Sequence, residues 1–409
     1  MRVDVVTSGD PTPLSVDVPD SMQICELLCR IGMLRCIPSW RLRVLHSHRA
    51  LSRDASLDEL ELRDGVLLTL VVKPASSFVL LGTADGSVEL WDIDDCNMIR
   101  SFVGHRMNEV KSVDEFVIDD LTWINAVAFS QNGFLALSGS NDGTARLWDT
   151  DNGVCIQCYD SKLRNQTSSD PVAVICVGFV GNGEFRDTVV TGNGGGSIML
   201  WSMEDCGKPL RTAWPHGNPC YGKHVTVAMF SHDGCCAFSA VVDDNRLKMW
   251  SVASGICIKY FVHDCLRIIR AVLSPDGDSL LTACDAGTYF LWDIRSGDCM
   301  RIFGRASLVG PKCADLSPDG KFVIGIVSRR GEQFAVLWNV RTGKVILRFE
   351  HPLDDFDWLY CVAFSSDSQV ALTGGGDGSV RIWNIISGEC ARLIRSASFS
   401  GLFAVTFAP

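Results

Sequence analysis

The sequence predicts a mainly β-sheet protein built from seven repeats of one four-stranded unit, and three observations support this prediction. A large aliphatic residue precedes tryptophan at the end of seven strand-like runs, at Trp91, Trp148, Trp201, Trp250, Trp292, Trp338 and Trp383. Successive tryptophans lie 57, 53, 49, 42, 46 and 45 residues apart, a period typical of propeller blades with loop insertions. Asp-Gly and Asn-Gly turns divide the repeats into short apolar runs, which indicates antiparallel hairpins. We therefore expect a seven-bladed β-propeller.

The second repeat shows the four strands most clearly. Its predicted strands are 126–130, 134–140, 145–149 and 154–159. They are separated by turns that end in glycine, at 131–133, 141–143 and 151–153. Glycine adopts the left-handed backbone that tight turns require. The stretches 271–277, 314–320 and 362–368 open three further repeats in the same way.

The two ends of the repeat region complement each other. The last predicted strand, residues 402–408, matches a first strand such as 127–130. The runs 78–83, 87–91 and 96–102 match the second, third and fourth strands of a blade that lacks its first. We expect strand 402–408 to complete this first blade, because pairing the two ends leaves no exposed sheet edge in the ring.

The repeats resemble the WD-repeat family over residues 78–409. In that family, a histidine, a Ser or Thr, a turn aspartate and the repeat tryptophan form a buried hydrogen-bonded network. The resemblance assigns this network to His105, Ser138, Asp142 and Trp148 in the second blade, and to His351, Thr373, Asp377 and Trp383 in the seventh. In the fourth blade it assigns His216, Asp244 and Trp250.

Other blades depart from this network. The turn aspartate is replaced by Gly195, Ala286 and Glu332 in the third, fifth and sixth blades. His263 is kept in the fifth blade, whereas Arg305 stands at the histidine position of the sixth. A catalytic Ser-His-Asp triad is the alternative interpretation of these side chains. Their recurrence at the repeat spacing favours a structural role, because buried polar groups need partners.

Residues 1–73 form a separate predicted domain, followed by the propeller at 74–409. Its predicted elements are a hairpin (2–7 and 14–18), a helix (22–32) capped by Asp20 or Ser21, and strands at 42–45 and 67–72. Stretch 49–65 in particular resembles the ubiquitin-like fold. Residues 68–72 have an alternative use as the first strand of blade one.

The N-terminal domain departs from ubiquitin in ways that bear on function. No diglycine follows Val72, and no lysine precedes Lys73, so conjugation as a free modifier is not predicted. The family's apolar docking patch maps to Leu45, Thr69 and Val71. Two interpretations follow from the resemblance: a receptor-docking module, or a folded cap fused to the ring.

Two insertions ahead of the second and seventh blades combine aromatic and acidic residues. Trp123 and Trp358 occupy matching places in these insertions, on the ring face that also holds the Asp-Gly turns. The candidate partner-binding residues are Phe116, Asp119, Asp120, Trp123, Asp354, Asp355, Phe356, Asp357 and Trp358. Aromatic anchors ringed by carboxylates suit a basic peptide. The alternative is that the tryptophans fill the blade ends and the acids are solvated.

Composition narrows the class of protein. The chain has a net charge of −11. Residues 1–73 contain nine Lys/Arg and ten Asp/Glu and so carry only −1 of it. The predicted propeller is therefore acidic and a poor match for nucleic acid or anionic membranes. The 18 cysteines recur partly at repeat positions and are expected to be reduced thiols, with no metal or cofactor site. No apolar run spans a membrane, and the start of the chain has no signal-peptide pattern, so a cytoplasmic protein is expected, the nucleus remaining open.

Sequence alone therefore predicts a non-enzymatic scaffold that binds partner proteins or peptides, including basic ones. The alternative is a substrate receptor or adaptor in ubiquitin–proteasome signalling, with ubiquitin-ligase or proteasome components as partners. Trp292-Asp293-Ile294-Arg295 resembles the motif by which some WD-repeat proteins join cullin-based ligases. Asp-x-Arg after the tryptophan also occurs in ordinary blades.

Overall fold

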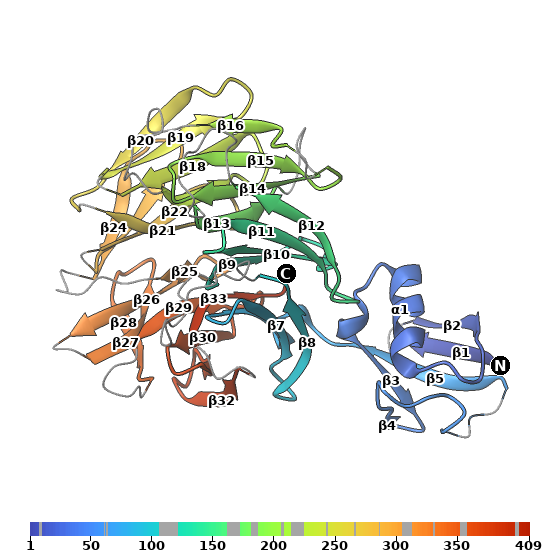
Figure 1. Cartoon of the computed structure of the whole chain (residues 1–409). Coiled ribbons are helices and arrows are strands. Elements are labelled where there is room, and N and C mark those ends of the chain that lie inside the picture. Colours follow the sequence, from blue (N-terminus) through green and yellow to red (C-terminus); the bar gives the residue numbers. More distant parts are fainter. Residues whose placement is uncertain are drawn as a thin grey trace, which may run out of the picture.

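The computed structural model describes most of the chain, and strands dominate it. The described residues are 1–7, 10–60, 62, 64–105, 122–161, 172–180, 187–205, 208–213, 225–242, 244–265, 267–285, 287–304, 313–329, 332–351, 358–396 and 401–409. They form a five-stranded sheet, seven four-stranded sheets and one α-helix. The five-stranded sheet and the helix stand to one side of the four-stranded sheets (Figure 1). This architecture fits a WD40 propeller.

The N-terminal unit is a mixed sheet packed against one helix. Its elements are β1 (Arg2–Thr7), β2 (Asp10–Asp17), α1 (Ile24–Arg35), the 3-10 turn η1 (Ser39–Arg41), β3 (Leu42–His46), β4 (Arg49–Ala50) and β5 (Val66–Val72). The strand order is β2-β1-β5-β3-β4. The first and last strands of the unit in sequence, β1 and β5, are parallel neighbours within the sheet. Alternate residues such as Val3, Val5 and Leu68 are buried with Leu27 and Ile31 of the helix. The unit therefore has a core of its own.

The helix begins later than the sequence predicted, and its predicted caps are wrong. α1 starts at Ile24 after Gln23, which makes no side-chain cap bond. The free N–H groups of Ile24 and Cys25 instead donate to the carbonyls of Ala55 and Arg53, at 2.9 and 3.0 Å. The backbone carbonyls of Ala55 and Arg53 thus take the place of a side-chain cap. The local sequence around the helix start does not predict this contact.

The seven four-stranded sheets follow one another along the chain. Sheet one contains β33 (Leu402–Phe407), β6 (Phe78–Thr83), β7 (Ser87–Asp92) and β8 (Asn97–Val103). Sheet two contains β9 (Ile124–Phe129), β10 (Leu135–Ser140), β11 (Thr144–Asp149) and β12 (Cys155–Asp160). Sheet three contains β13 (Val174–Phe179), β14 (Thr188–Asn193), β15 (Ile198–Ser202) and β16 (Arg211–Ala213). Sheet four contains β17 (Val225–Phe230), β18 (Cys236–Val241), β19 (Arg246–Ser251) and β20 (Cys257–Val262).

The last three sheets repeat the same order. Sheet five contains β21 (Ile268–Leu273), β22 (Ser279–Cys284), β23 (Tyr289–Asp293) and β24 (Cys299–Phe303). Sheet six contains β25 (Ala314–Leu316), β26 (Phe322–Arg329), β27 (Glu332–Asn339) and β28 (Val345–Phe349). Sheet seven contains β29 (Leu359–Phe364), β30 (Val370–Gly375), β31 (Ser379–Asn384) and β32 (Cys390–Arg395).

The ends of the repeat region share sheet one. β33 pairs antiparallel with β6, with Leu402 opposite Thr83 and Phe407 opposite Val79. It ends at Phe407, one residue before the predicted end. β5 is used in the N-terminal sheet, where it pairs with β1 and β3. The first strands of sheets one to seven contact one another in turn, and β29 of sheet seven contacts β33.

Neighbouring sheets are joined by an aromatic contact that repeats. A large side chain on the fourth strand of one sheet packs against the repeat tryptophan of the next. The ring-centroid distances are 5.8 Å for Phe102–Trp148, 5.5 Å for Tyr159–Trp201, 5.7 Å for Phe261–Trp292, 6.2 Å for Phe303–Trp338 and 5.3 Å for Phe349–Trp383. Such contacts bury large apolar areas and fix the sheets relative to one another.

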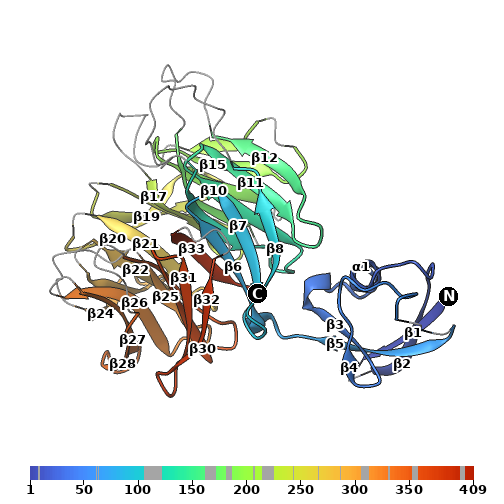
Figure 2. The same cartoon turned by 60° about the horizontal axis from the view of Figure 1, so that its bottom comes forward.

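The strand register defines two faces of the propeller region. In sheet two, Ile124 lies opposite Ser140 and Thr144 opposite Asp160, so these four ends share one edge. We call this edge, with its counterparts in the other sheets, the site face. The opposite edge carries the turns between third and fourth strands, and we call it the docking face. The N-terminal unit lies at the docking face (Figures 1 and 2).

Trp40 of the N-terminal unit is buried in the apolar cluster of sheets one and two. It is 2% exposed, and its ring centroid lies 4.8 Å from Phe78 and 6.0 Å from Phe129. Its indole N–H donates to Thr150 Oγ1 at 3.1 Å. It belongs to the cluster that contains Phe78 and Trp148, not to the core around α1. Trp40 therefore joins the two units.

Polar contacts surround Trp40. The backbone N–H and hydroxyl of Ser39 donate to one carboxylate oxygen of Asp151, at 2.7 and 2.9 Å. Burial raises the pKa of Asp151 despite these bonds. Lys73 reaches Asp92 and Asp95 at 2.8 Å each; burial lowers its pKa, but the bonds to the two carboxylates outweigh this and leave it raised.

Candidate functional site

The predicted partner-binding residues are only partly covered by the structure. Trp123 and Trp358 are described. The remaining candidates lie outside the described residues: Phe116, Asp119, Asp120, Asp354, Asp355, Phe356 and Asp357. Their role therefore stays a prediction.

Trp123 and Trp358 occupy equivalent places on the site face. Each stands immediately before the first strand of its sheet, β9 or β29. The carbonyl of Trp123 accepts the N–H of Asn141 at 3.0 Å, and that of Trp358 accepts the N–H of Gly376 at 2.9 Å. Both donors begin the turn after the second strand. The backbone of each tryptophan is thus fixed, and both side chains are half-buried.

A β-bulge in the first strand presents a further side chain on this face. The register shifts between Leu359 and Cys361 in β29, and between Leu402 and Ala404 in β33. Tyr360 and Phe403 are the extra residues at these bulges. An extra residue leaves the ladder and its side chain is re-aimed, which explains why these rings are half-buried although their neighbours are in the core.

Three aromatic rings from three sheets form a continuous row. Trp123 stacks on Phe403 with centroids 4.4 Å apart and planes at 15°. Tyr360 also contacts Phe403, with ring centroids 4.5 Å apart and planes inclined at 52°. We call Tyr360, Phe403 and Trp123 the aromatic row. Sequence reasoning missed Phe403, although its place in the strand matches that of Tyr360.

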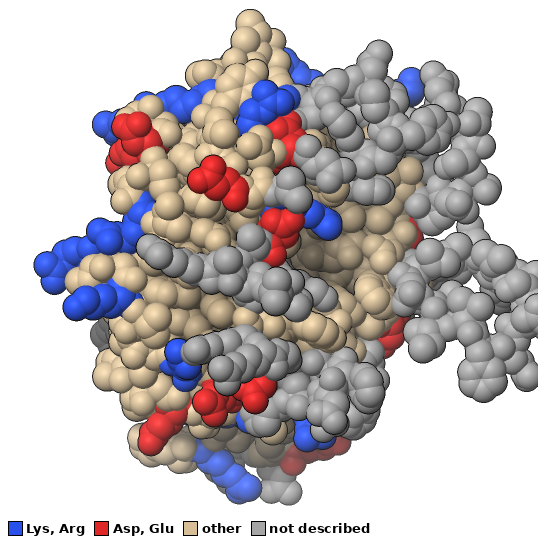
Figure 3. Space-filling model, turned by 90° about the vertical axis from the view of Figure 1, so that its left-hand side faces the viewer, with Lys and Arg blue, Asp and Glu red and all other residues tan. Residues whose placement is uncertain are grey.

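The charge of the described site face is mixed. Figure 3 shows the side turned away from the N-terminal unit, with Lys/Arg and Asp/Glu interspersed around a central hollow. The acidic character predicted for this face depends on carboxylates outside the described residues. It therefore stays a prediction.

The side chains that resemble a catalytic triad form a buried network in sheet two. His105 contacts Asp142 through Nδ1 at 2.9 Å and Ser138 through Nε2 at 2.7 Å. The Ser138 hydroxyl oxygen also accepts the indole N–H of Trp148 at 2.8 Å. Burial lowers the pKa of His105, so its neutral form is favoured although Asp142 opposes the shift. Ser138 is fully buried, and all of these bonds lie in the interior of the sheet.

Sheet seven has a related network with a different partner order. His351 contacts the Thr373 hydroxyl through Nδ1 and the Ser379 hydroxyl through Nε2, both at 2.8 Å, and Trp383 donates to Thr373 at 3.0 Å. Asp377 lies 3.8 Å from His351 and accepts the Ser379 hydroxyl. Burial raises the pKa of Asp377, but the nearby His351 and the hydrogen bonds from Ser379 outweigh burial, so that the pKa is lowered. Ser379 thus bridges the histidine and the aspartate.

The incomplete networks keep the bond to the tryptophan. Trp292 donates to Thr282, which also contacts His263, whereas Trp250 donates to Ser239. Asp244 pairs with Arg246 at 2.9 Å. The predicted partner His216 lies outside the described residues, as do Ala286 and Arg305.

Cysteine pairing differs from the prediction at one place. The structure joins Cys265 and Cys284 in a disulfide, so the expectation of reduced thiols throughout is wrong for this pair. The two residues are 19 apart in sequence and meet only because β22 ends beside the segment before β21. Among the described residues, His, Cys, Asp and Glu form no cluster suited to a metal ion. No described helix is long and apolar enough to cross a membrane.

Two segments match a known family model. Residues 116–149 and 343–384 match the WD domain, G-beta repeat. These segments contain the third strands of sheets two and seven, and with them Trp148 and Trp383. The repeat matches and the relatives below support a WD-repeat protein, a class that generally serves as a non-enzymatic scaffold for protein interactions.

The relatives share the repeat region at low identity. Pre-mRNA-processing factor 17 of Mus musculus is 24% identical over 321 residues, which cover 76% of this chain and 49% of that protein. Apoptotic protease-activating factor 1 of Homo sapiens is 22% identical over 360 residues, or 80% of this chain and 26% of that protein. Nuclear distribution protein PAC1 of Arthroderma otae is 24% identical over 317 residues, or 70% and 64%. The matched part spans about half the length of the first of these relatives.

Proposed function

We propose that this protein is a seven-bladed scaffold that binds partner proteins through the aromatic row on its site face. In this proposal the seven four-stranded sheets are the blades of a closed ring, and the N-terminal unit is a ubiquitin-like domain fixed to the opposite face. The single observation that carries the proposal is the row itself. Three half-exposed rings from three separate sheets converge at one place on the site face.

The chemistry of the row suits an anchor site. Aromatic side chains supply large contact areas with little conformational entropy to lose, and such residues dominate binding energy at interfaces. Backbone bonds to Asn141 and Gly376 fix the segments that carry Trp123 and Trp358. The predicted carboxylates at 119–120 and 354–357 would favour a basic segment in the partner.

The test removes two side chains of the aromatic row and leaves the propeller folded. The double variant Trp123→Ala/Tyr360→Ala leaves Phe403 to complete sheet one. A matched control, Ile156→Ala/Ile346→Ala, removes exposed apolar side chains from two outer strands. Partners recovered by quantitative affinity purification should be lost with the first variant and kept with the control, with similar melting temperatures. Partners retained by the double variant would refute the aromatic row as the binding site.

A second candidate function, in ubiquitin signalling, is favoured by the position of Arg295. Its side chain is 83% exposed at the docking face, where it pairs with Asp278 at 3.2 Å. In the next sheet, Arg341 occupies the corresponding position after Trp338-Asn339 and is also exposed. Arg295→Ala should therefore remove ligase adaptor subunits from the purified complex, while Arg341→Ala keeps them. Equal recovery with both variants contradicts this second function.

The strand order of the N-terminal unit supports the ubiquitin-like part of the proposal. The mapped docking patch is half-buried, with Leu45 opposite Thr69 and Val71 opposite Arg43. Arg43 in turn pairs with Asp92 of sheet one at 2.9 Å. The patch of Leu45, Thr69 and Val71 therefore lies beside the interface between the N-terminal unit and sheet one. Its exposed part remains available to a receptor.

A further inference from the structure

One stretch of this acidic chain is strongly basic. Residues 295–348, which run from the turn after the third strand of sheet five to the fourth strand of sheet six, contain ten Lys/Arg and four Asp/Glu. The net charge of this stretch is therefore +6, whereas the whole chain carries −11. A local reversal of charge on a protein surface attracts partners of the opposite sign.

Part of this positive charge lies at the docking-face turn of sheet six. This turn, residues 339–344, contains Arg341 and Lys344 and no carboxylate. The six residues after the repeat tryptophan are neutral or net acidic in every other repeat: 92–97, 149–154, 202–207, 251–256, 293–298 and 384–389. Arg341 and Lys344 are both exposed. Sheet six thus differs from the other sheets at this turn.

Arg301 of β24 adds a third cation beside the turn of sheet six. It occupies a position that repeats in the fourth strand of every sheet, opposite the residue before the repeat tryptophan. The seven members of this series are Arg100, Gln157, Arg211, Lys259, Arg301, Leu347 and Arg392. The half-buried Arg301 lies against Gly343, where an added Cβ would come within 2.9 Å of its Nη1 atom.

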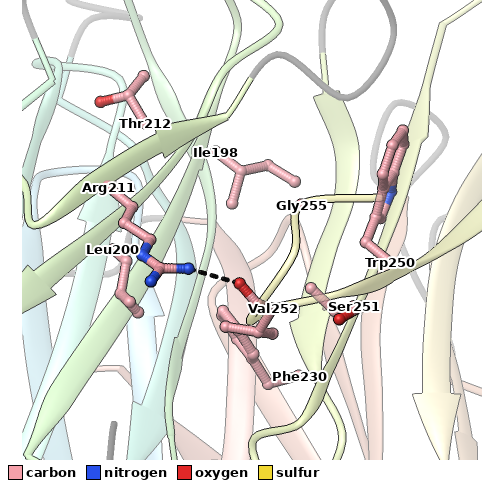
Figure 4. Close-up of a pocket in the computed structure, with 10 residues that line it drawn as sticks. Ile198, Leu200, Arg211, Thr212, Phe230, Trp250, Ser251, Val252 and Gly255 are labelled. Carbon is pink, nitrogen blue, oxygen red and sulfur yellow. Dashed lines mark hydrogen bonds between the residues drawn. The ribbon is translucent and has the colours of Figure 1, made fainter. Parts of the chain in front are cut away.

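The other polar members of this series are hydrogen-bonded to the turn of the next sheet. Arg100 donates to the Asn152 carbonyl at 3.1 Å, Gln157 to Glu204 at 3.2 Å, Arg211 to Val252 at 2.6 Å, Lys259 to Ile294 at 2.8 Å, and Arg392 to the Asp94 carboxylate at 3.0 Å. Figure 4 shows the Arg211 bond. Within the described part of the chain, the Arg301 guanidinium makes no such bond, and neither Arg341 nor Lys344 has an ion-pair partner. The described residues therefore leave these three charges available.

The docking-face surroundings of the three cations are described throughout. The described ranges 287–304, 313–329, 332–351 and 358–396 include every docking-face turn of sheets five, six and seven. β28 is the outer strand of sheet six, on the side of the propeller away from the N-terminal unit (Figure 1). The N-terminal unit therefore does not cover this region.

Apolar side chains lie beside the cations. Val345 and Ile346, directly after Lys344, are 51% and 43% exposed. Arg348 follows in the same strand, with its guanidinium 5.2 Å from the Phe334 ring centroid. A ligand made only of phosphates would gain nothing from the apolar side chains, whereas a protein segment that alternates carboxylates with apolar residues matches both features. The combination favours a protein partner.

We propose that this surface, formed by Arg301, Arg341, Lys344, Val345 and Ile346 and called the basic edge, binds an extended acidic segment of a partner protein. Carboxylates of the segment pair with the three cations, and apolar residues between them cover Val345 and Ile346. Arginine suits such pairs because it offers two parallel N–H donors to one carboxylate. The basic edge belongs to sheets five and six, whereas the aromatic row belongs to sheets seven, one and two, so the two proposals fail independently.

The experiment measures peptide binding to the full chain by fluorescence anisotropy. Three fluorescein-labelled peptides are compared: Asp-Val-Glu-Val-Glu-Ile-Asp, its serine form Asp-Ser-Glu-Ser-Glu-Ser-Asp, and Lys-Val-Lys-Val-Lys-Ile-Lys. The first peptide should bind saturably, and roughly tenfold more tightly than the lysine peptide. It should also bind more tightly than the serine form, which lacks the apolar contacts. Equal binding of the first peptide and either of the others overturns the proposal.

Two double variants test where the peptide binds. Arg341→Glu/Lys344→Glu should weaken binding of the first peptide by roughly tenfold or more, because two attractive charges become repulsive. Arg30→Glu/Arg49→Glu makes the same change in net charge at exposed residues of the N-terminal unit and should leave binding unchanged.

A neutral variant and a lipid control complete the test. Arg341→Gln/Lys344→Gln should cause a smaller loss than charge reversal, and it replaces that variant if charge reversal lowers the melting temperature. Peptide binding that survives these substitutions overturns the proposal. So does tighter binding of phosphatidylserine vesicles than of the first peptide, because the basic edge would then be a membrane contact.

Discussion

Replacing Trp40 by alanine should detach the N-terminal unit without unfolding it. Trp40 packs in the cluster of sheets one and two and takes no part in the core around α1. The N-terminal core therefore survives the substitution, and the lost contacts are those with Phe78, Phe129 and Thr150. The variant thus isolates the docking free energy from the stability of either unit.

The expected loss is about 3–5 kcal/mol, the usual range for truncation of a fully buried tryptophan. This corresponds to a weakening of docking by roughly two to three and a half orders of magnitude. The hydrogen bond contributes about 1 kcal/mol of it. Thr150 keeps a partner in the variant, because its hydroxyl donates to the Gly133 carbonyl at 2.8 Å. Trp40→Phe, which retains most of the packing, should therefore cost much less.

Calorimetry and small-angle scattering measure this loss on the full chain. In the wild type, we expect the N-terminal unit and the propeller region to unfold together. Trp40→Ala should give a separate, earlier transition for the N-terminal unit and a larger radius of gyration, because the described contacts that still hold it are the polar ones of Ser39, Arg43 and Lys73. Met33→Ala, which removes an exposed side chain of α1, is the matched control. An unchanged thermogram and radius for Trp40→Ala would refute the reasoning.

Two further predictions concern sheets five and one. Burial lowers the pKa of His263 to about 4 from an ordinary value of 6.5, so the unfolded chain takes up the proton first as the pH falls. The free energy of unfolding should therefore decrease by about 3 kcal/mol between pH 6.5 and pH 4 on account of this residue, and His263→Gln should flatten that slope in chemical denaturation. Deleting 402–409 removes β33 with the buried residues Leu402, Val405 and Phe407 from sheet one. The melting temperature should fall by more than for Ile386→Ala, an exposed control, and an equal melting temperature would show that β33 is dispensable.

The strands were predictable because their signals are local. Turn glycines with positive φ, such as Gly143 and Gly153, mark hairpin ends whatever the rest of the chain does. The repeat tryptophans mark the third strand for the same reason. Strand β6 begins and ends where the sequence predicted, and most other predicted bounds differ by one to three residues. The two-residue error at the start of α1 arose where residues 53–55 supply the cap from another part of the chain.

The aromatic row and the docked interface were not predictable because they join distant parts of the chain. Phe403 is some 280 residues from Trp123 in sequence. A β-bulge changes the direction of its side chain, and no local sequence pattern predicts that bulge. In the sequence, Trp40 lies in a short segment between predicted elements of the N-terminal domain. Only the structure shows that it packs in the apolar cluster of sheets one and two.

The position of the N-terminal unit couples docking to the proposed binding site. Trp40 packs against residues of sheets one and two, and these two sheets also present Phe403 and Trp123 on the opposite face. Docking therefore stabilises the sheets that hold two of the three rings, while leaving the site face uncovered. A partner at the aromatic row should consequently bind more weakly when Trp40 is replaced.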